Sequence, residues 1–290
     1  MFLQLTIGGL MLGSVYALVA LGYSLIYSSS GLMTFVQGDM FMLGGFLIYT
    51  FSVMMDFPLL LAVLLSLAVM FAVGGGTEKG VISPLQKLGA SGINIVLATI
   101  ALSTLLQNIA MLGWGTSVFN VPAMFGDTIV KIMGVSVTYQ QIGIMVVAFI
   151  CMLILHFFMN ETRMGISMRA AAMDRTAASS VGINVPGTIA VTWGIACVLA
   201  ALGGLLLAPI YGVYAKMGAI VSSKGFAAAV VGGYGNMYGA MVGGLLLGLV
   251  ETFAAGYISS AIKDIVCYLI LILVMFVKPS GIFNGKVLAN

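Results

Sequence analysis

The chain has 290 residues, of which 61% are hydrophobic and only 7% carry a charge. A soluble domain of this length needs a far more charged surface, so the composition excludes one and indicates an integral membrane protein. The net charge of +3 comes from residues scattered along the chain, so it gives no indication of nucleic-acid binding and serves only to orient the spans.

Apolar windows long enough to cross a bilayer, roughly 20 residues each, recur along the chain. No lysine or arginine precedes Lys79, so we interpret the first window as a retained span and not as a cleaved signal. The sequence therefore predicts one all-α domain over residues 1–290, a polytopic transmembrane helical bundle with about eight spans. The predicted spans are 4–27, 31–53, 58–76, 93–113, 140–159, 188–209, 237–257 and 263–279.

Two segments are predicted to enter the membrane without crossing it as regular helices. Residues 210–236 contain the apolar stretch 225–231, which runs into a glycine-rich segment and is too short to cross alone. Residues 31–45, with Gln37-Gly38-Asp39 in their middle, show a similar pattern. Irregular backbone reaches membrane depth where it is buried in protein or lines a cavity, so we expect both segments to be broken or re-entrant.

Basic residues concentrate in three segments, 77–92, 160–187 and the tail, and basic loops face the cytoplasm. The segment 114–139, with Asp127 and Lys131, is then expected outside. Eight simple spans would leave both ends of the chain on the same side of the membrane. If the broken segment 218–236 also crosses, the assigned sides agree with an external N-terminus and an internal tail.

Polar residues inside the apolar windows are few. Asp39 and Glu251 are the only acidic residues deep in such stretches, where a carboxylate costs roughly 2.5–3.5 kcal/mol. For each, a structural hydrogen bond and a role in a pathway both stay open. The fourth window carries a polar row, Asn94, Thr99, Ser103, Gln107 and Asn108, which fits either a cavity lining or interhelical hydrogen bonds. The candidate translocation path consists of Thr34, Gln37, Gly38, Asp39, Asn94, Thr99, Ser103, Gly232 and Gly233.

Glycines repeat every four residues in three places, which gives helix faces where backbones approach closely. The repeats are Gly9 with Gly13, Gly244 with Gly248, and Gly235 with Gly239 and Gly243. Packing within the chain and a subunit interface are both compatible with such faces.

The segment 161–184 is the one long polar interruption of the chain. Its alanines favour a short helix with little side-chain bulk, which can dock closely into another protein on the water side. Gly182 suits a left-handed helix C-cap, with Ile183 as its hydrophobic contact and Pro186 ending the segment.

Four stretches together resemble the permeases of branched-chain amino acid ABC importers of the LivH type. The opening of the chain, the polar interruption, a late glycine-rich break and the tail all match, so the resemblance covers most of the sequence. One departure is Thr34, where the family commonly has Asn. The matching residues are 13–27, 31–38, 42–45, 165–174, 177–178, 182–184, 226–239 and 279–283.

The resemblance implies a set of partners and a membrane. Such permeases pair with a homologous second permease, two cytoplasmic ATP-binding cassette subunits and an extracytoplasmic solute-binding protein, in the lipid of the bacterial cytoplasmic (inner) membrane. The segment 160–187 would be the cytoplasmic coupling segment. Its implied contacts with the ATPase are Arg169, Ala170, Ala171, Ala172, Asp174, Arg175, Ala178 and Gly182.

Two rival classes of function were weighed against an importer subunit. A secondary transporter would also use broken helices, but it needs no docking helix and usually shows an inverted repeat, which is not clear in the sequence. An intramembrane enzyme would need a nucleophile with a base or a metal cluster. The chain has one histidine and neither an HExxH nor a Walker A motif, so it lacks the residues that such an enzyme would need. We therefore expect no enzymatic activity, no metal and no cofactor.

The few polar groups beside the breaks favour a small zwitterion with an apolar side chain, such as leucine, isoleucine or valine, over a sugar. Relatives of the same architecture carry urea or short amides, so these solutes and other amino acids are the alternatives.

Overall fold

A computed structural model of the chain describes residues 1–126, 128–132 and 135–283 and consists mainly of helices. Short π-helical turns over Thr50–Met54 and Glu78–Ile82 extend α2 and α3. The helices are α1 (Phe2–Ser30), α2 (Gln37–Tyr49), α3 (Leu59–Thr77), α4 (Ser83–Lys87), α5 (Gly92–Trp114), α6 (Tyr139–Glu161), α7 (Arg163–Met173), α8 (Arg175–Ser180), α9 (Val185–Tyr211), α10 (Met217–Gly232), α11 (Met237–Tyr257) and α12 (Lys263–Val277).

The all-α prediction needs one small addition. Two strands, β1 (Ile129–Ile132) and β2 (Val135–Thr138), form an antiparallel hairpin in which Val130 lies opposite Val137. The hairpin belongs to the segment 114–139 that was expected on the outer side; Asp127 of that segment lies outside the described residues.

Among the described helices, six are long and apolar enough to cross a membrane: α1, α3 with its extension to Lys87, α5, α6, α9 and α11. The other two predicted spans are shorter helices. The predicted span 31–53 begins as a helix only at Gln37, and the predicted span 263–279 is the 15-residue α12. The predicted loop 77–92 is wrong over residues 77–87, because the helix that starts at Leu59 continues to Lys87.

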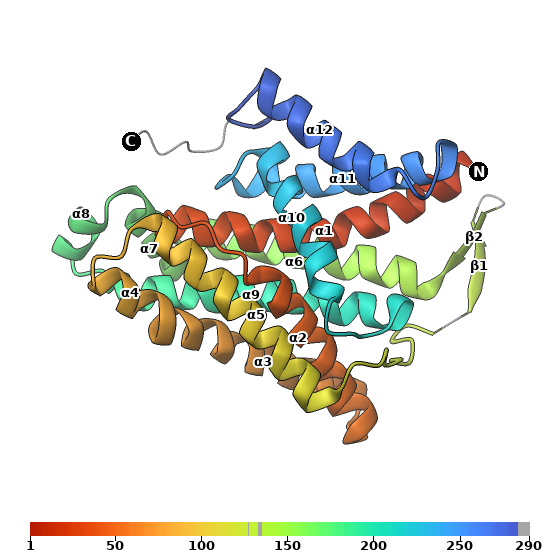
Figure 1. Cartoon of the computed structure of the whole chain (residues 1–290), viewed down its shortest axis with the longest axis horizontal. Helices are drawn as coiled ribbons and strands as arrows, with labels where there is room; N and C mark the ends of the chain where they lie inside the picture. Colours follow the sequence, from red (N-terminus) through yellow and green to blue (C-terminus); the bar gives the residue numbers. More distant parts are fainter. Residues whose placement is uncertain (127, 133–134, 284–290) are drawn as a thin grey trace.

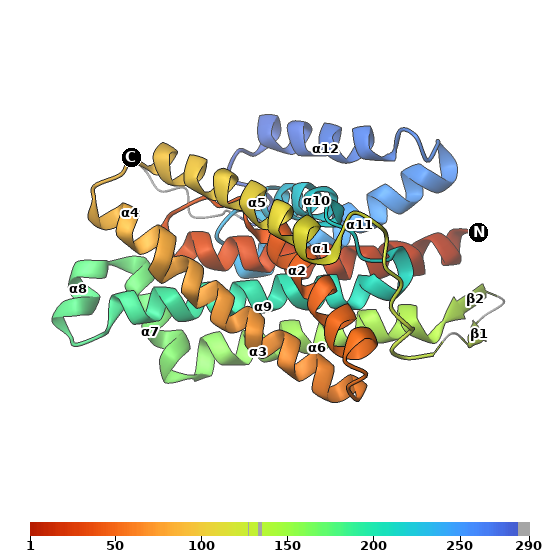
Figure 2. The same ribbon diagram turned by 60° about the horizontal axis from the view of Figure 1, so that its bottom comes forward.

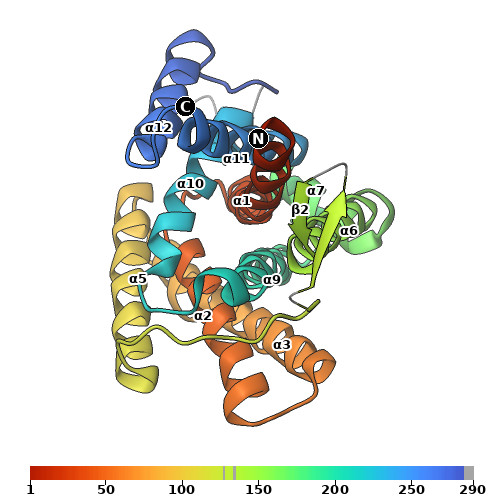
Figure 3. The same cartoon turned by 90° about the vertical axis from the view of Figure 1, so that its right-hand side faces the viewer.

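Helices α1 and α9 form the centre of the bundle, as the view along its long axis shows (Figure 3). In the most apolar window of α9, 83% of the residues are buried, against 17% in α5. Helices α3, α5, α6 and α12 lie on the outside of the bundle, where α5 crosses one side (Figure 2). Their apolar outer faces are therefore available to lipid or to a partner subunit.

The two ends of the bundle differ (Figure 1). The N-terminus and the β-hairpin lie at one end, whereas α4, α7 and α8 lie together at the other. The two basic segments 77–92 and 160–187 thus share one end, opposite the N-terminus, as their charge predicted. Helix α12 runs back from the N-terminal end toward the end that carries α7 and α8.

The order of contacts repeats with the chain direction reversed. Helix α1 packs along α11, and in the same way α9 packs along α3. Helix α10 contacts α1, and correspondingly α2 contacts α9. Because α1 and α9 run in opposite directions, the set α1, α2, α3, α5 recurs as α9, α10, α11, α12 in inverted orientation (Figure 1). This inverted repeat, which the sequence did not reveal, removes one of the arguments that separated an importer subunit from a secondary transporter.

Glycines make the closest helix contacts inside the chain. A Cβ atom added to Gly248 of α11 would overlap the backbone of Gly13 in α1, and one added to Gly13 would lie 2.9 Å from the Cα of Leu245. A Cβ on Gly239 would overlap the carbonyl of Gly232 at the end of α10. These contacts confirm packing within the chain for the repeated glycines that lie in helices. Gly235 is an exception to the predicted helix face, because it lies in the turn before α11 with a φ of 85°.

Candidate functional site

Both predicted breaks are present. Helix α1 ends at Gly31, whose left-handed φ of 67° lets its amide donate to the Tyr27 carbonyl at 2.8 Å, and residues 31–36 return into the bundle. Helix α10 ends at Gly233, with φ 114°, and Gly235 follows with φ 85°. A residue with a Cβ rarely adopts the positive φ angles of Gly31, Gly233 and Gly235, so glycine is favoured at these turns.

The half-helices α2 and α10 meet in the middle of the bundle, where α10 crosses steeply inclined to α1 (Figure 1). They touch at a pair of glycines: a Cβ on Gly218 would overlap the Gly38 carbonyl, and one on Gly38 would lie 2.6 Å from the Gly218 carbonyl oxygen. Gln37 anchors the start of α2, because its Nε2 donates to the Ala196 carbonyl of α9 at 2.6 Å. The crossing is thus fixed by backbone contact and one buried amide.

A cavity of about 380 Å³ lies beside this crossing, between α2, α5, α10 and α12. Figure 3 shows α10 between α5 and α12, the helices that supply much of the lining of this cavity. Its polar lining is Tyr23, Asp39, Ser103, Gln107, Ser222, Ser223 and Tyr268, and the rest of its lining is Phe35, Gly38, Ile100, Ala219, Phe226 and Leu271.

Asp39 is the only charged side chain among the described residues that line this cavity. It lies in the first turn of α2 and is 2% exposed. Gln107 of α5 donates from Nε2 to Asp39 Oδ1 at 2.9 Å, and the same nitrogen lies 3.3 Å from Ser103 Oγ. The part of the predicted polar row that faces α2 is therefore Thr99, Ser103 and Gln107, one helical turn apart.

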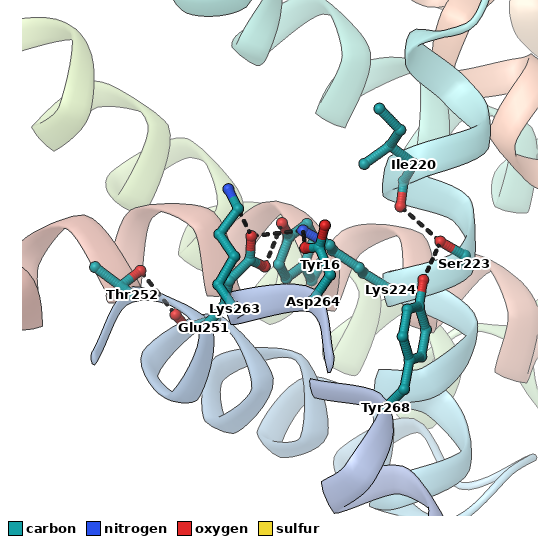
Figure 4. Close-up of polar contacts among 10 residues, drawn as sticks. Tyr16, Ile220, Ser223, Lys224, Glu251, Thr252, Lys263, Asp264 and Tyr268 are labelled. Atoms are coloured by element: carbon teal, nitrogen blue, oxygen red, sulfur yellow. Dashed lines mark hydrogen bonds and ion pairs between the residues drawn. The ribbon is translucent and has the colours of Figure 1, made fainter. Parts of the chain in front are cut away.

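Hydroxyl groups line the α10 side of the cavity. The hydroxyls of Tyr23 and Ser222 lie 2.5 Å apart. Ser223 accepts a hydrogen bond from the Tyr268 hydroxyl at 2.8 Å and donates to the Ile220 carbonyl at 2.9 Å (Figure 4). The cavity thus combines one carboxylate, one amide and several hydroxyls with an apolar wall.

Lys224 points away from the cavity, into a buried ion-pair network (Figure 4). Its Nζ lies 2.5 Å from Glu251 Oε1 of α11 and 2.8 Å from Asp264 Oδ1 of α12. Glu251 also accepts a hydrogen bond from the Tyr16 hydroxyl at 2.8 Å and lies 3.3 Å from Lys263 Nζ. These contacts join α10 to α1, α11 and α12, and they hold the serine face of α10 toward the cavity.

The structure separates the candidate path residues into three groups. Gly38, Asp39 and Ser103 line the cavity. Thr34, Gln37 and Thr99 are buried outside the cavity lining and take part in hydrogen bonds, such as the one from the Phe35 amide to Thr99 Oγ1 at 3.3 Å. Asn94 is exposed, and Gly232 and Gly233 pack against Gly239 and Gly281 at the far end of α10.

Tyr23, Ser222, Ser223 and Tyr268 were not among the candidate path residues, and Gln107 was noted only as part of the polar row. Single tyrosines and serines in apolar windows give no signal of the face they occupy, because those helices are apolar on all sides. For Ser222 and Ser223, their place just before the glycine-rich break was the one usable hint.

The polar interruption folds as two short helices instead of one. Asp174 ends α7 and caps α8, since its Oδ1 accepts hydrogen bonds from the Thr176 and Ala177 amides at 2.8 and 3.0 Å. At the other end of α8, Gly182 has φ 86°, and the Ile183 amide donates to the Ala178 carbonyl at 3.1 Å. The predicted left-handed cap is confirmed. Pro186 lies at the start of α9, so it opens the next helix as well as ending the segment.

The candidate coupling residues have different surroundings. Ala171 and Ala178 are buried against the bundle, whereas Ala170 and Ala172 are partly exposed. Arg169 donates to the Asn160 side chain at 3.2 Å, and Arg175 donates to the Ser30 carbonyl at the end of α1 at 2.5 Å. The most exposed large apolar side chains of the segment are two that sequence reasoning did not select, Met173 at 79% and Val181 at 78%.

The described residues contain no group of three or more His, Cys, Asp or Glu side chains arranged to hold a metal ion. A many-spanning bundle, two short helices α2 and α10 that meet at a cavity, and a polar end formed by α7 and α8 together define the class of this protein. It is a multi-pass membrane permease.

Comparison with known proteins gives the particular family. Residues 5–275 match the family model described as the branched-chain amino acid transport system permease component, and the chain belongs to this family. It is 36% identical to the high-affinity branched-chain amino acid transport system permease protein LivH of Escherichia coli, over 98% of this chain and 96% of that protein. Identity, and coverage of both chains, are the same for the permease protein BraD of Pseudomonas aeruginosa. A probable LivH of Methanocaldococcus jannaschii is 26% identical, over 95% and 90% of the two chains. No solved structure matches the chain.

Proposed function

We propose that this chain is a membrane-spanning subunit of an ATP-driven importer of branched-chain amino acids in a bacterial cytoplasmic membrane. The observation that carries the proposal is the similarity to LivH and BraD along nearly the whole of each chain, because it includes both half-helices and the docking end. The cavity at Asp39 suits a small solute with an apolar part, in agreement with those names.

The chain would supply one half of the pathway. Its cavity is lined in part by α5 and α12, whose outer faces are apolar, and a homologous second permease seated on these faces would complete the pathway. An extracytoplasmic binding protein would deliver the solute at the end that carries the N-terminus and the hairpin. Lipid would cover the remaining apolar surface of the outer helices.

ATP hydrolysis would be done by two cassette subunits at the end that carries α7 and α8. The exposed Met173 and Val181 give this end an apolar docking surface, and the capped ends of α8 keep the two side chains in place. Movement of the cassettes would reach the core through Arg175, which joins α8 to the end of α1.

The test is uptake by liposomes that contain the complete complex with its binding protein. Labelled leucine, isoleucine or valine should accumulate only when ATP is supplied on the side of the membrane that carries the cassettes and the binding protein is present on the opposite side. Accumulation without ATP would overturn the importer in favour of a secondary transporter. Accumulation of urea or acetamide, with all three amino acids ignored, would overturn the solute class alone.

A pair of variants tests the docking surface in the same liposomes. Replacing Met173 and Val181 together by serine should lower uptake at least tenfold, since the apolar contact with the cassettes is lost. Val277→Ser is the matched control, because Val277 is also 77% exposed and apolar but ends α12. Normal uptake in the double variant would show that the cassettes dock elsewhere.

A further inference from the structure

We propose that Asp39 determines which solutes pass, by receiving the ammonium group of the solute at the crossing of α2 and α10. The proposal rests on the proposed importer function and adds the group of the solute that the pathway would recognise, its ammonium group. A solute with an ammonium group and an apolar side chain would be admitted, and a neutral amide or an anion would be rejected.

The first argument is the charge of the cavity. Asp39 is 2% exposed, and the side chains that hydrogen-bond to its carboxylate, Gln107 and Ser103, are both neutral. None of the ion pairs among the described residues includes Asp39. A carboxylate removed from water is strongly stabilised by a cation, so the cavity as built has a place for one positive group.

The second argument is the position of Lys224, a cation on one of the helices that line the cavity. Lys224 lies on α10, two residues from Ser222 of the cavity, but its side chain points to the other side of the helix. There it is held by Glu251 at 2.5 Å and by Asp264 at 2.8 Å. The ion-pair network therefore keeps Lys224 from neutralising Asp39 and leaves that carboxylate for the solute.

The remaining lining fits the other parts of a zwitterion. Phe35 and Phe226, whose ring centroids are 5.8 Å apart, together with Ile100 and Leu271 offer apolar surface to a branched side chain. The hydroxyl of Tyr23 can donate to the solute carboxylate when Ser222 donates to Tyr23. Urea and short amides carry no positive charge for Asp39, and a 2-oxo acid would meet it with like charge.

The first test uses the complete complex with binding protein in liposomes. Asp39→Asn keeps the shape and removes the charge, so leucine uptake should fall about 10- to 100-fold, the effect of one lost charge-assisted hydrogen bond. ATP hydrolysis stimulated by the leucine-loaded binding protein should stay within about twofold, and Asp39→Glu should recover most of the uptake. A merely structural role of Asp39 would lower hydrolysis and uptake together.

The matched control is Asp56→Asn, which removes a carboxylate from an exposed turn outside the cavity and should leave uptake unchanged. Asn tolerates the positive φ of 55° at this position. Normal leucine uptake by Asp39→Asn would overturn the inference and leave the importer function intact. Failure of the unmodified complex to take up any branched-chain amino acid would instead contradict the proposed function.

A second measurement does not depend on the folding of an Asp39 variant. In a background without the native cysteines, Ser103→Cys places a thiol in the cavity, and Ser260→Cys places one on the exposed turn before α12. The ratio of modification rates by a trimethylammonium and a sulfonate methanethiosulfonate should be at least tenfold higher at position 103. Equal ratios at the two positions would show that Asp39 attracts no cation, which would overturn the proposal.

Discussion

Removing the carboxylate of Glu251 should destabilise the bundle by about 3–5 kcal/mol, the usual effect of breaking a buried ion pair. In Glu251→Leu, Lys224 would keep only Asp264 as an ion-pair partner, at 2.8 Å, and the side chain of Asp264 is 53% exposed. The Tyr16 hydroxyl would lose its acceptor at the same time. The lost free energy corresponds to a change of roughly 10²- to 10³-fold or more in the folding equilibrium.

The double variant Lys224→Met with Glu251→Leu separates lost charge pairing from lost packing. No uncompensated charge stays buried in it, because Lys263 and Asp264 are both exposed enough to be hydrated, at 38% and 53%. Replacing both members of a buried ion pair by apolar residues is often neutral, so most of the lost stability should return, to within about 1–2 kcal/mol of the original protein.

The assay is reversible unfolding of the purified permease in mixed micelles by increasing amounts of dodecyl sulfate. Trp193, which is 1% exposed in the centre of the bundle, reports the transition through its fluorescence. Equal losses in the single and the double variant would refute the reasoning, since packing and not charge would then account for the effect. A single variant as stable as the original protein would refute it as well.

Three further predictions concern other parts of the chain. A cysteine at Ser179 should be modified by an impermeant reagent only from the cytoplasmic side and one at Ser260 only from outside; the reverse labelling would invert the topology. Gly248→Ala should cost about 1–3 kcal/mol in the same unfolding assay, because its Cβ meets α1, whereas Gly113→Ala, with nothing within 4 Å, should cost nothing; equal losses would contradict the close contact. Asn236→Ala should cost about 1 kcal/mol by removing the cap of α11, and an unchanged midpoint would show that the cap is dispensable.

Several features of the fold could be predicted because their signals are local. The long helices follow from apolar length, and the two breaks follow from glycines at positions where the backbone takes a positive φ, such as Gly31 and Gly233. A short helical segment between two spans follows from a run of polar residues and alanine, and the structure has α7 and α8 there. Each of these signals lies within some 20 neighbouring residues, the length of one span.

The features that could not be predicted depend on residues far apart in the chain. The partners of Lys224 are Glu251 and Asp264 on later helices, and Tyr16 joins the network from the first helix. Helices α1 and α9 are apolar on every side, so no hydrophobic stripe shows which of their faces turns inward. The inverted repeat is a relation between contacts, and a sequence read from one end to the other does not display it.

The pairing of α1 with α11 also determines the order in which the helices can pack during synthesis. Tyr16 and Glu251 are 235 residues apart in the chain, and Gly9 and Gly13 of α1 meet the backbone of α11 as Gly244 and Gly248 of α11 meet that of α1. During synthesis, the glycine face of α1 therefore stays without its partner helix α11 until almost the whole chain has been inserted. The half-helix α10 packs against α1 and α11 alike, so it settles only in that final step. In a chain cut short before α11, the glycine face of α1 would lack its partner helix, although α1 could still pack against α9.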